Sequence, residues 1–166
     1  GDPETGDDKS MYAPGQLGAR VTLVQPTRTP AGVEEGRPKT YQYVKTDSSM
    51  SVAPFKGAIA WWANSAQYLV TTDATNRGRI AGVFQGAPAK GNFCFVQQKG
   101  PATVKYVDAP TSAPDATGKF VVPSTTAGKA DCIATAPTFP PLGIAVGTRD
   151  ANSEGVVELD VIENVD

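Results

Sequence analysis

Short apolar runs separated by glycine and proline give the chain its pattern, and they are clearest between Arg79 and Val107. Three runs of strand length stand here, separated by the segments GAPAKG and KGP. Apolar runs of this length between Gly- and Pro-rich turns are typical of an antiparallel β-meander. The pattern therefore predicts three strands: Arg79–Gln85, Asn92–Gln98 and Ala102–Val107.

The middle strand of this meander is apolar on both faces. Phe93 and Phe95 point to one side of an extended chain, and Cys94 and Val96 point to the other. A sheet with one solvent-exposed face alternates apolar and polar residues along each strand instead. We therefore expect this strand to be sandwiched, with Phe93 and Phe95 in the core and the second face covered by a loop, another sheet or a neighbouring subunit.

Similar runs recur along the rest of the chain, and no segment shows an amphipathic helix of three turns. They are Val21–Gln25, Thr40–Thr46, Lys56–Ala63, Ala66–Thr72, Lys119–Val122, Asp131–Thr135, Leu142–Arg149 and Val156–Ile162. The proline- and glycine-rich segment PTRTPAGVEEGRPK between the first two is expected to be a long surface loop. The fold predicted is all-β, a compact sandwich or barrel of about ten short, mainly antiparallel strands.

Residues 1–18 differ from the rest of the chain, because they contain Pro3, Pro14 and four acidic residues but little apolar periodicity. Such a segment cannot build a packed element by itself. It is either a disordered terminus or an extended arm that becomes ordered on a neighbouring molecule, with Met11 and Tyr12 as its apolar anchors. We therefore divide the chain into an extended N-terminal arm, residues 1–18, and a single β domain, residues 19–166.

Trp61 and Trp62 are adjacent in the apolar run GAIAWWA. Neighbouring residues of a strand point to opposite faces, so only one of the two rings can enter a one-sided core. Three interpretations stay open: a strand buried on both faces, an anchor for another protein, or a sugar-stacking platform completed by nearby tyrosines. We name Trp61 and Trp62, together with Met11 and Tyr12, as candidate interface residues.

The residue types present argue against an enzyme. The chain has no histidine, which removes the Ser-His-Asp and Cys-His arrangements and most zinc sites. Glu158 and Asp160, two residues apart on the solvent face of the last strand, could form a glycosidase-like pair, but a solvated strand face explains them better. We expect no catalytic residues, no cofactor and no metal site.

Charge and composition narrow the classes of partner. The 166-residue chain has a net charge of −2 and no basic stripe, so we expect no direct contact with nucleic acid. No apolar run approaches the roughly 20 residues of a membrane-spanning helix, so we expect no membrane segment. The two cysteines, Cys94 and Cys132, could pair or stay free, and their spacing does not decide between these states.

Three segments together resemble the decoration, or cement, proteins of tailed-bacteriophage capsids: KTYQYVKTDSSMSVAPFKGAIAWW, GRIAGVFQGAPAKGNFCFVQQKGPATVKY and LGIAVGTRDANSEGVVELDVI. The features that carry the resemblance are the small-residue segment Ala81–Val83, the aromatic strand Gly91–Gln97, the short strand Ala102–Val104 and the later strand beginning at Leu142–Ala145. The resemblance covers roughly residues 38–162 and is a pattern of strands rather than of catalytic residues.

The resemblance implies a structural virion protein that binds the outer surface of a phage capsid at junctions between major capsid subunits and stabilises the shell. Its expected partners are then the major capsid protein and further copies of itself, as a dimer or trimer. Its expected location is the capsid exterior, after assembly in the host cytoplasm. The alternative is a glycan- or host-binding β module of a head fibre or surface protein.

Overall fold

The computed structural model describes residues 17–24, 26–29, 32–35, 38–74, 79–138 and 140–161, with only the backbone described for 26–29 and 32–35. Apart from short 3-10 turns such as Ser65–Gln67, the regular structure in these ranges consists of strands. Their bounds are β1 Arg20–Leu23, β2 Pro26–Thr29, β3 Gly32–Glu35, β4 Lys39–Thr46, β5 Ile59–Asn64, β6 Leu69–Thr71, β7 Ile80–Phe84, β8 Phe93–Lys105, β9 Phe120–Pro123, β10 Ala130–Ile133, β11 Gly143–Ala145 and β12 Glu154–Asp160.

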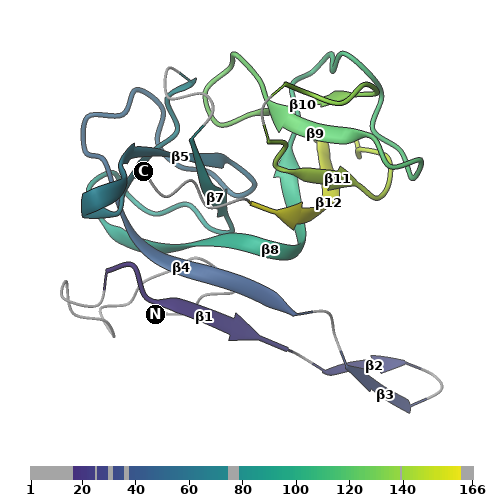
Figure 1. Cartoon of the computed structure of the whole chain (residues 1–166), viewed down its shortest axis with the longest axis horizontal. Helices are drawn as coiled ribbons and strands as arrows, with labels where there is room; N and C mark the ends of the chain where they lie inside the picture. Colours follow the sequence, from purple (N-terminus) through teal and green to yellow (C-terminus); the bar gives the residue numbers. More distant parts are fainter. Residues whose placement is uncertain are drawn as a thin grey trace.

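Ten of these strands form one continuous sheet, and five of them close into a barrel (Figure 1). The barrel runs β4, β6, β5, β7, β8, and β8 pairs again with β4. Four of its five ladders are antiparallel, and the β4–β6 ladder is parallel. Closure leaves these strands without the free edges of an open sheet. The prediction of a compact, mainly antiparallel all-β fold is confirmed.

The long strand β8 joins the two halves of the molecule. The first two strands of the predicted meander pair antiparallel as expected, but its second turn is wrong. The KGP segment does not turn the chain back; residues 93–105 form one strand of 13 residues. Before Gly100, β8 pairs with β4 and β7, and from Lys99 onward it pairs with β12. Gly100 has a φ of +91°, which bends the strand without ending it. The Gln97 side chain supports the bend, because its Nε2 donates to the carbonyls of Lys99 and Pro101, both at 3.0 Å.

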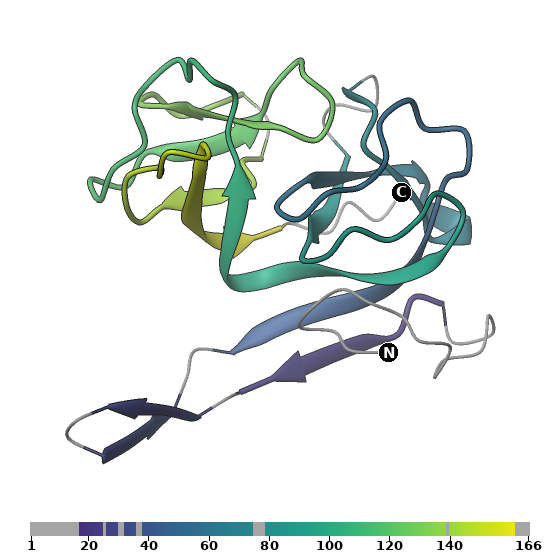
Figure 2. The ribbon, with the colours of Figure 1, turned by 180° about the vertical axis from the view of Figure 1, so that it is seen from behind.

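The second half of β8 belongs to a second ring of strands (Figure 2). The ladder continues from β8 through β12, β11 and β9 to β10. A parallel bridge between Tyr106 and Ala130 then connects β10 to the chain just beyond β8 and closes the ring. The Val107 N–H donates to the Ala130 carbonyl at 2.9 Å there. We call this ring the second lobe. The strand β8 is thus shared by the barrel and the second lobe.

The two rings also share side-chain packing through β5 and β7. One buried cluster fills the barrel and includes Val44, Trp62 and Cys94. A larger cluster fills the second lobe, and Ile59, Trp61 and Val83 reach into it from the outer surface of the barrel. Because β5 is buried on both faces, Trp61 and Trp62 are both enclosed although they point in opposite directions.

The outer face of β4 and β8 carries a third cluster, made of Tyr41, Tyr43 and Phe95. The ring centroids of Tyr43 and Phe95 are 5.1 Å apart, and Leu17, Val21 and Leu23 pack over the group from β1 and the residues before it. The expectation that the predicted strand Asn92–Gln98 is covered on both faces is confirmed. The assignment of the faces changes, because Cys94 and Val96 point into the barrel while Phe93 and Phe95 lie on its outer side.

Two further local predictions differ from the structure. The segment expected to be a surface loop contains the hairpin β2–β3, whose ladder runs from Pro26–Glu35 to Thr29–Gly32. Its strands lack apolar alternation, so their residue pattern does not predict them. The strand expected at Ala66–Thr72 is interrupted, because a 3-10 turn precedes Tyr68, which is left-handed with a φ of 52°, and β6 begins only at Leu69.

Candidate interaction surface

The residues named as interface candidates do not form one surface. Trp61 is 1% exposed and Trp62 is 6% exposed, so neither ring is offered to a partner. Among the three interpretations of this pair, the structure agrees with a strand buried on both faces. Met11 and Tyr12 lie outside the described residues.

The two cysteine thiols of the described chain are enclosed. Cys94 and Cys132 are both free thiols, buried in the two separate clusters of the barrel and the second lobe. Burial raises the pKa of the Cys132 thiol above its ordinary value, and burial likewise raises the pKa of Tyr106, which Cys132 raises further. Both groups therefore stay protonated at neutral pH, as parts of an apolar core.

The carboxylates singled out from the sequence lie on the outer face of β12. Glu158 is half-buried opposite Pro101 of β8, and Asp160 is exposed opposite Lys99. No three or more His, Cys, Asp and Glu side chains come together as a metal site within the residues that the structure describes. None of the helical segments described is long and apolar enough to cross a membrane.

A row of partly exposed side chains crosses the outer face of the second lobe. Strand register places Ile133 of β10 opposite Phe120 of β9, and Phe120 opposite Ile144 of β11. The row continues through Glu158 of β12 to Pro101 of β8. Directly opposed residues lie on the same face of a sheet, so these five form a line across five strands. We call it the outer row.

Several side chains next to the row residues along the strands point inward. Val121, Cys132 and Val157, for example, are fully buried in the second-lobe cluster. The outer row is half-exposed instead, and two valines extend it: Val146 is 45% exposed and Val156 is 43% exposed. Contiguous apolar side chains left in water are characteristic of surfaces that another molecule covers.

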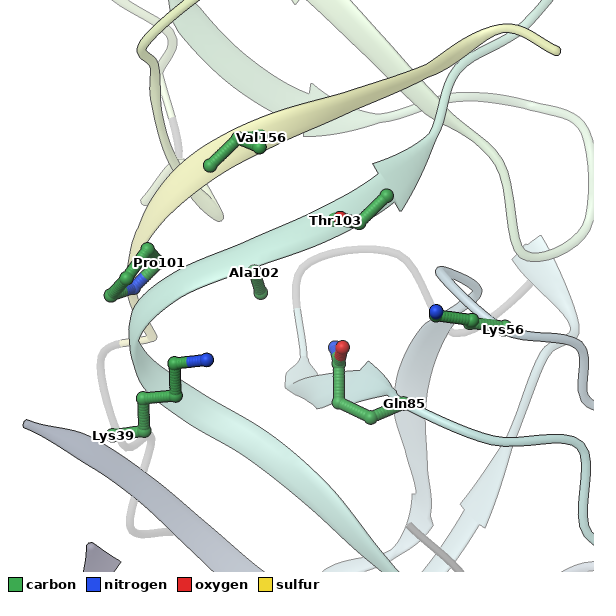
Figure 3. A pocket seen from close by; sticks show the side chains of 7 residues that line it. All are labelled: Lys39, Lys56, Gln85, Pro101, Ala102, Thr103 and Val156. Carbon is green, nitrogen blue, oxygen red and sulfur yellow. The ribbon is translucent and has the colours of Figure 1, made fainter. Parts of the chain in front are cut away.

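The outer row ends at a pocket of about 330 Å³ where β8 bends away from β7. The described residues that line it are Lys39, Lys56, Gln85, Pro101, Ala102, Thr103 and Val156. Figure 3 shows Lys39 and Lys56 on opposite sides of the space, with the Gln85 side chain between them and Ala102 facing them from β8. We call it the lysine pocket.

Within the described residues, the hydrogen-bond donors of the lysine pocket lack acceptors. The Nε2 atom of Gln85 is buried and has no hydrogen-bond partner among the described residues. Lys39 and Lys56 form no ion pair within the described chain, and no described carboxylate lines the pocket. A buried donor without an acceptor costs free energy, so an acceptor brought by another molecule would stabilise this site.

A second candidate contact element is the hairpin β2–β3. In both Figures 1 and 2 it lies beyond the body of the molecule, at the end of the extension formed by β1 and β4. Its two strands pair with each other and form a sheet separate from the ten-stranded one. A two-stranded hairpin is only marginally stable alone in water, so packing on a partner would stabilise it.

No protein-family model matches this chain, and no curated protein matches it either. The surface therefore has to be understood from its own residues. Alternation along β11 and β12 signals one buried and one outward face for each strand. Sequence reasoning did not identify the lysine pocket, because Lys39, Lys56 and Gln85 lie on separate segments and only the bend of β8 brings them together.

Proposed function

We propose that this protein is a structural component of a phage virion, bound to the outer surface of the capsid at junctions between major capsid subunits, where it stabilises the shell. The observation that carries the proposal is the projecting hairpin β2–β3, an arm that leaves the body and finds no further strand partner in the described chain. The resemblance of the strand pattern to decoration proteins motivates the choice of partner.

The outer row supports the same proposal. It offers half-exposed, mainly apolar side chains on the outer face of the second lobe, at a distance from the hairpin (Figure 1). A molecule with two separated contact regions can bridge neighbouring subunits, and the small free energy of each contact is multiplied over the many copies on a shell. Contacts to further copies of the protein, as a dimer or trimer, would use the same regions.

The glycan-binding alternative receives less support. A sugar platform needs aromatic faces open to solvent, and Trp61, Trp62, Tyr41 and Tyr43 are all buried. No observation in the described part of the chain favours that function over a structural one.

The proposal is tested by binding to assembled heads of the phage whose major capsid gene neighbours the gene for this protein. We expect saturable co-sedimentation with the heads and a higher temperature of head disruption when the protein is bound. A variant with residues 26–35 replaced by a Gly-Ser linker should keep the circular dichroism spectrum and unfolding midpoint of the body but bind the heads more weakly. Absence of binding by the intact protein would refute the proposal.

A further inference from the structure

The lysine pocket combines two positive charges, an amide donor without an acceptor, and apolar lining residues. Lys39 comes from the start of β4, Lys56 from the segment before β5, and Gln85 follows β7. Ala102 and Pro101 form the wall on β8. The donors converge from three segments on one space, and an ammonium group or an amide N–H can bind a carboxylate there through charge-assisted hydrogen bonds.

The wall of the pocket is a strand edge. Ala102 and Thr103 of β8 have ladder partners only in β12, at Val157 and Val156, among the described residues. On its other side, β8 has already left β7 and β4, whose pairing with it ends at Gln97 and Lys99. Part of this edge is already occupied, because the Lys105 N–H donates to the Gly57 carbonyl at 3.0 Å and the Pro101 carbonyl accepts from Gln97 Nε2 at 3.0 Å. The main chain of Thr103 lies between these two contacts, and a strand edge can pair with an extended peptide through main-chain hydrogen bonds.

We propose that the lysine pocket is a receptor for an extended acidic segment of a protein partner, with one carboxylate held between Lys39, Lys56 and the Gln85 amide. The apolar residues of the segment then lie against Val156 and continue along the outer row. The identification of this partner as a capsid subunit rests on the proposed function. The chemistry of the pocket is independent of that function.

The apolar surroundings favour a peptide over a nucleic acid. Val156 is 43% exposed beside the pocket, and the adjoining outer row is made mainly of apolar side chains. The chain has a net charge of −2, and a nucleic-acid surface needs many phosphate-binding cations along a stripe. Two lysines beside apolar lining residues match a single carboxylate better than a row of phosphates.

The test uses the full chain labelled with ¹⁵N and a short blocked peptide of alternating aspartate and valine as probe. The side-chain amide signal of Gln85 should shift saturably with the peptide, because its Nε2 gains an acceptor. The same peptide with asparagine in place of aspartate should leave the signal unchanged. If the aspartate peptide produces no shift, or if both peptides shift Gln85 equally, the proposal is wrong.

Charge reversal locates the binding. The double variant Lys39→Glu/Lys56→Glu should bind the aspartate peptide at least about tenfold more weakly. Lys90→Glu is the matched control, since Lys90 is exposed in the β7–β8 connection and does not line the pocket, and it should bind normally. Equal loss in both variants would overturn the proposal, as would a stronger response of the Gln85 signal to single-stranded DNA than to the peptide.

Head binding separates this proposal from the proposed function. If the intact protein binds heads and Lys39→Glu/Lys56→Glu binds them equally well, the capsid contact does not use the pocket, and this inference is overturned for that partner while the function stands. If the intact protein binds the peptide through Gln85 but binds no heads, the function fails and the acidic-segment receptor stands.

Discussion

At the scale of single residues, a few positions carry constraints that their neighbours do not. Gly100 has a left-handed φ at the bend of β8, and Tyr68 is left-handed where β6 begins. Asp115 organises its own turn, because the Thr117 N–H and the Lys119 ammonium donate to its carboxylate at 2.9 and 2.8 Å. These residues determine where the chain bends or turns.

Replacing Gly100 by alanine should destabilise the protein by about 2 kcal/mol or more. Its φ of +91° disfavours any side chain, and a Cβ atom would also run into the carbonyl oxygen of Pro38. Gly147→Ala is the control, since a Cβ atom at that position would have no neighbouring atom within 4 Å. Urea denaturation of both variants measures the difference. Equal stability of the two variants would show that Gly100 does not constrain the bend.

Asp115 should contribute stability at neutral pH that disappears in acid. The hydrogen bond from Lys119, followed by those from Thr117, holds the pKa of this carboxyl well below its usual range. A carboxyl with a lowered folded pKa stabilises the fold above its unfolded pKa of about 4 and loses that effect as the pH falls further.

Asp115→Asn should therefore be less stable than the native chain at pH 7, with a gap that narrows steadily as the pH falls below about 4. The effect should be small, because the Lys119 and Asp115 side chains are 23% and 35% exposed and water screens their ion pair. Asp108→Asn, at an exposed position, serves as the control. Thermal unfolding followed across this range provides the measurement, and a gap that widens in acid would contradict the assignment.

At the scale of elements, β5 and β8 define the architecture because each serves two environments. The strand β5 sends Trp62 into the barrel and Trp61 into the second lobe. The strand β8 pairs with β4 and β7 in its first part and with β12 in its second. The strand β5 and the first part of β8 are buried on both faces, so they cannot be shifted or truncated without opening a core.

The two faces of β5 should be comparably intolerant of truncation. Trp61→Ala and Trp62→Ala should each cost about 3–5 kcal/mol, because each removes a large buried ring. The milder Trp61→Phe and Trp62→Phe variants keep the comparison measurable if the alanine variants do not fold. Val52→Ala, at a position 40% exposed, should change stability by less than about 0.5 kcal/mol. A large cost for only one tryptophan would contradict burial on both faces.

At the scale of the whole molecule, the barrel and the second lobe form one body with an extension on one side. The lobes share β8, and Ile59, Trp61 and Val83 connect their interiors. The extension of β1 and β4 carries the hairpin β2–β3 away from both (Figures 1 and 2). This shape is suited to contacts with more than one neighbour, which is what the proposed structural role requires.

The shared core predicts that the protein unfolds in a single cooperative transition, as one domain. Tryptophan fluorescence reports on β5, which faces both interiors, and far-UV circular dichroism reports on all strands. The two probes should give the same midpoint in urea. Separate midpoints, or a folded fragment of residues 99–161 alone, would show that the second lobe is an independent domain.

The sequence alone determined the class of fold, the approximate position of most strands and the inward face of several. Val157, Leu159 and Val161 illustrate this, since their alternation predicts a buried face and all three are buried. Alternation is a local property, because successive side chains of an extended chain point to opposite sides whatever the strand pairs with. The KGP segment, by contrast, has the composition of a turn and still lies inside β8.

Only the tertiary structure decided which strands are neighbours, and the interaction surface depends on that choice. Gly100 and Pro101 remain part of β8 because Leu159 and Glu158 of β12 pair with them, and these partners are distant in sequence. The same bend assembles Lys39, Lys56 and Gln85 into the lysine pocket, and the β9–β12 ladders align Phe120 with Ile144 in the outer row. Pairing between distant segments is chosen by the free energy of the whole sheet, which no short stretch of residues contains.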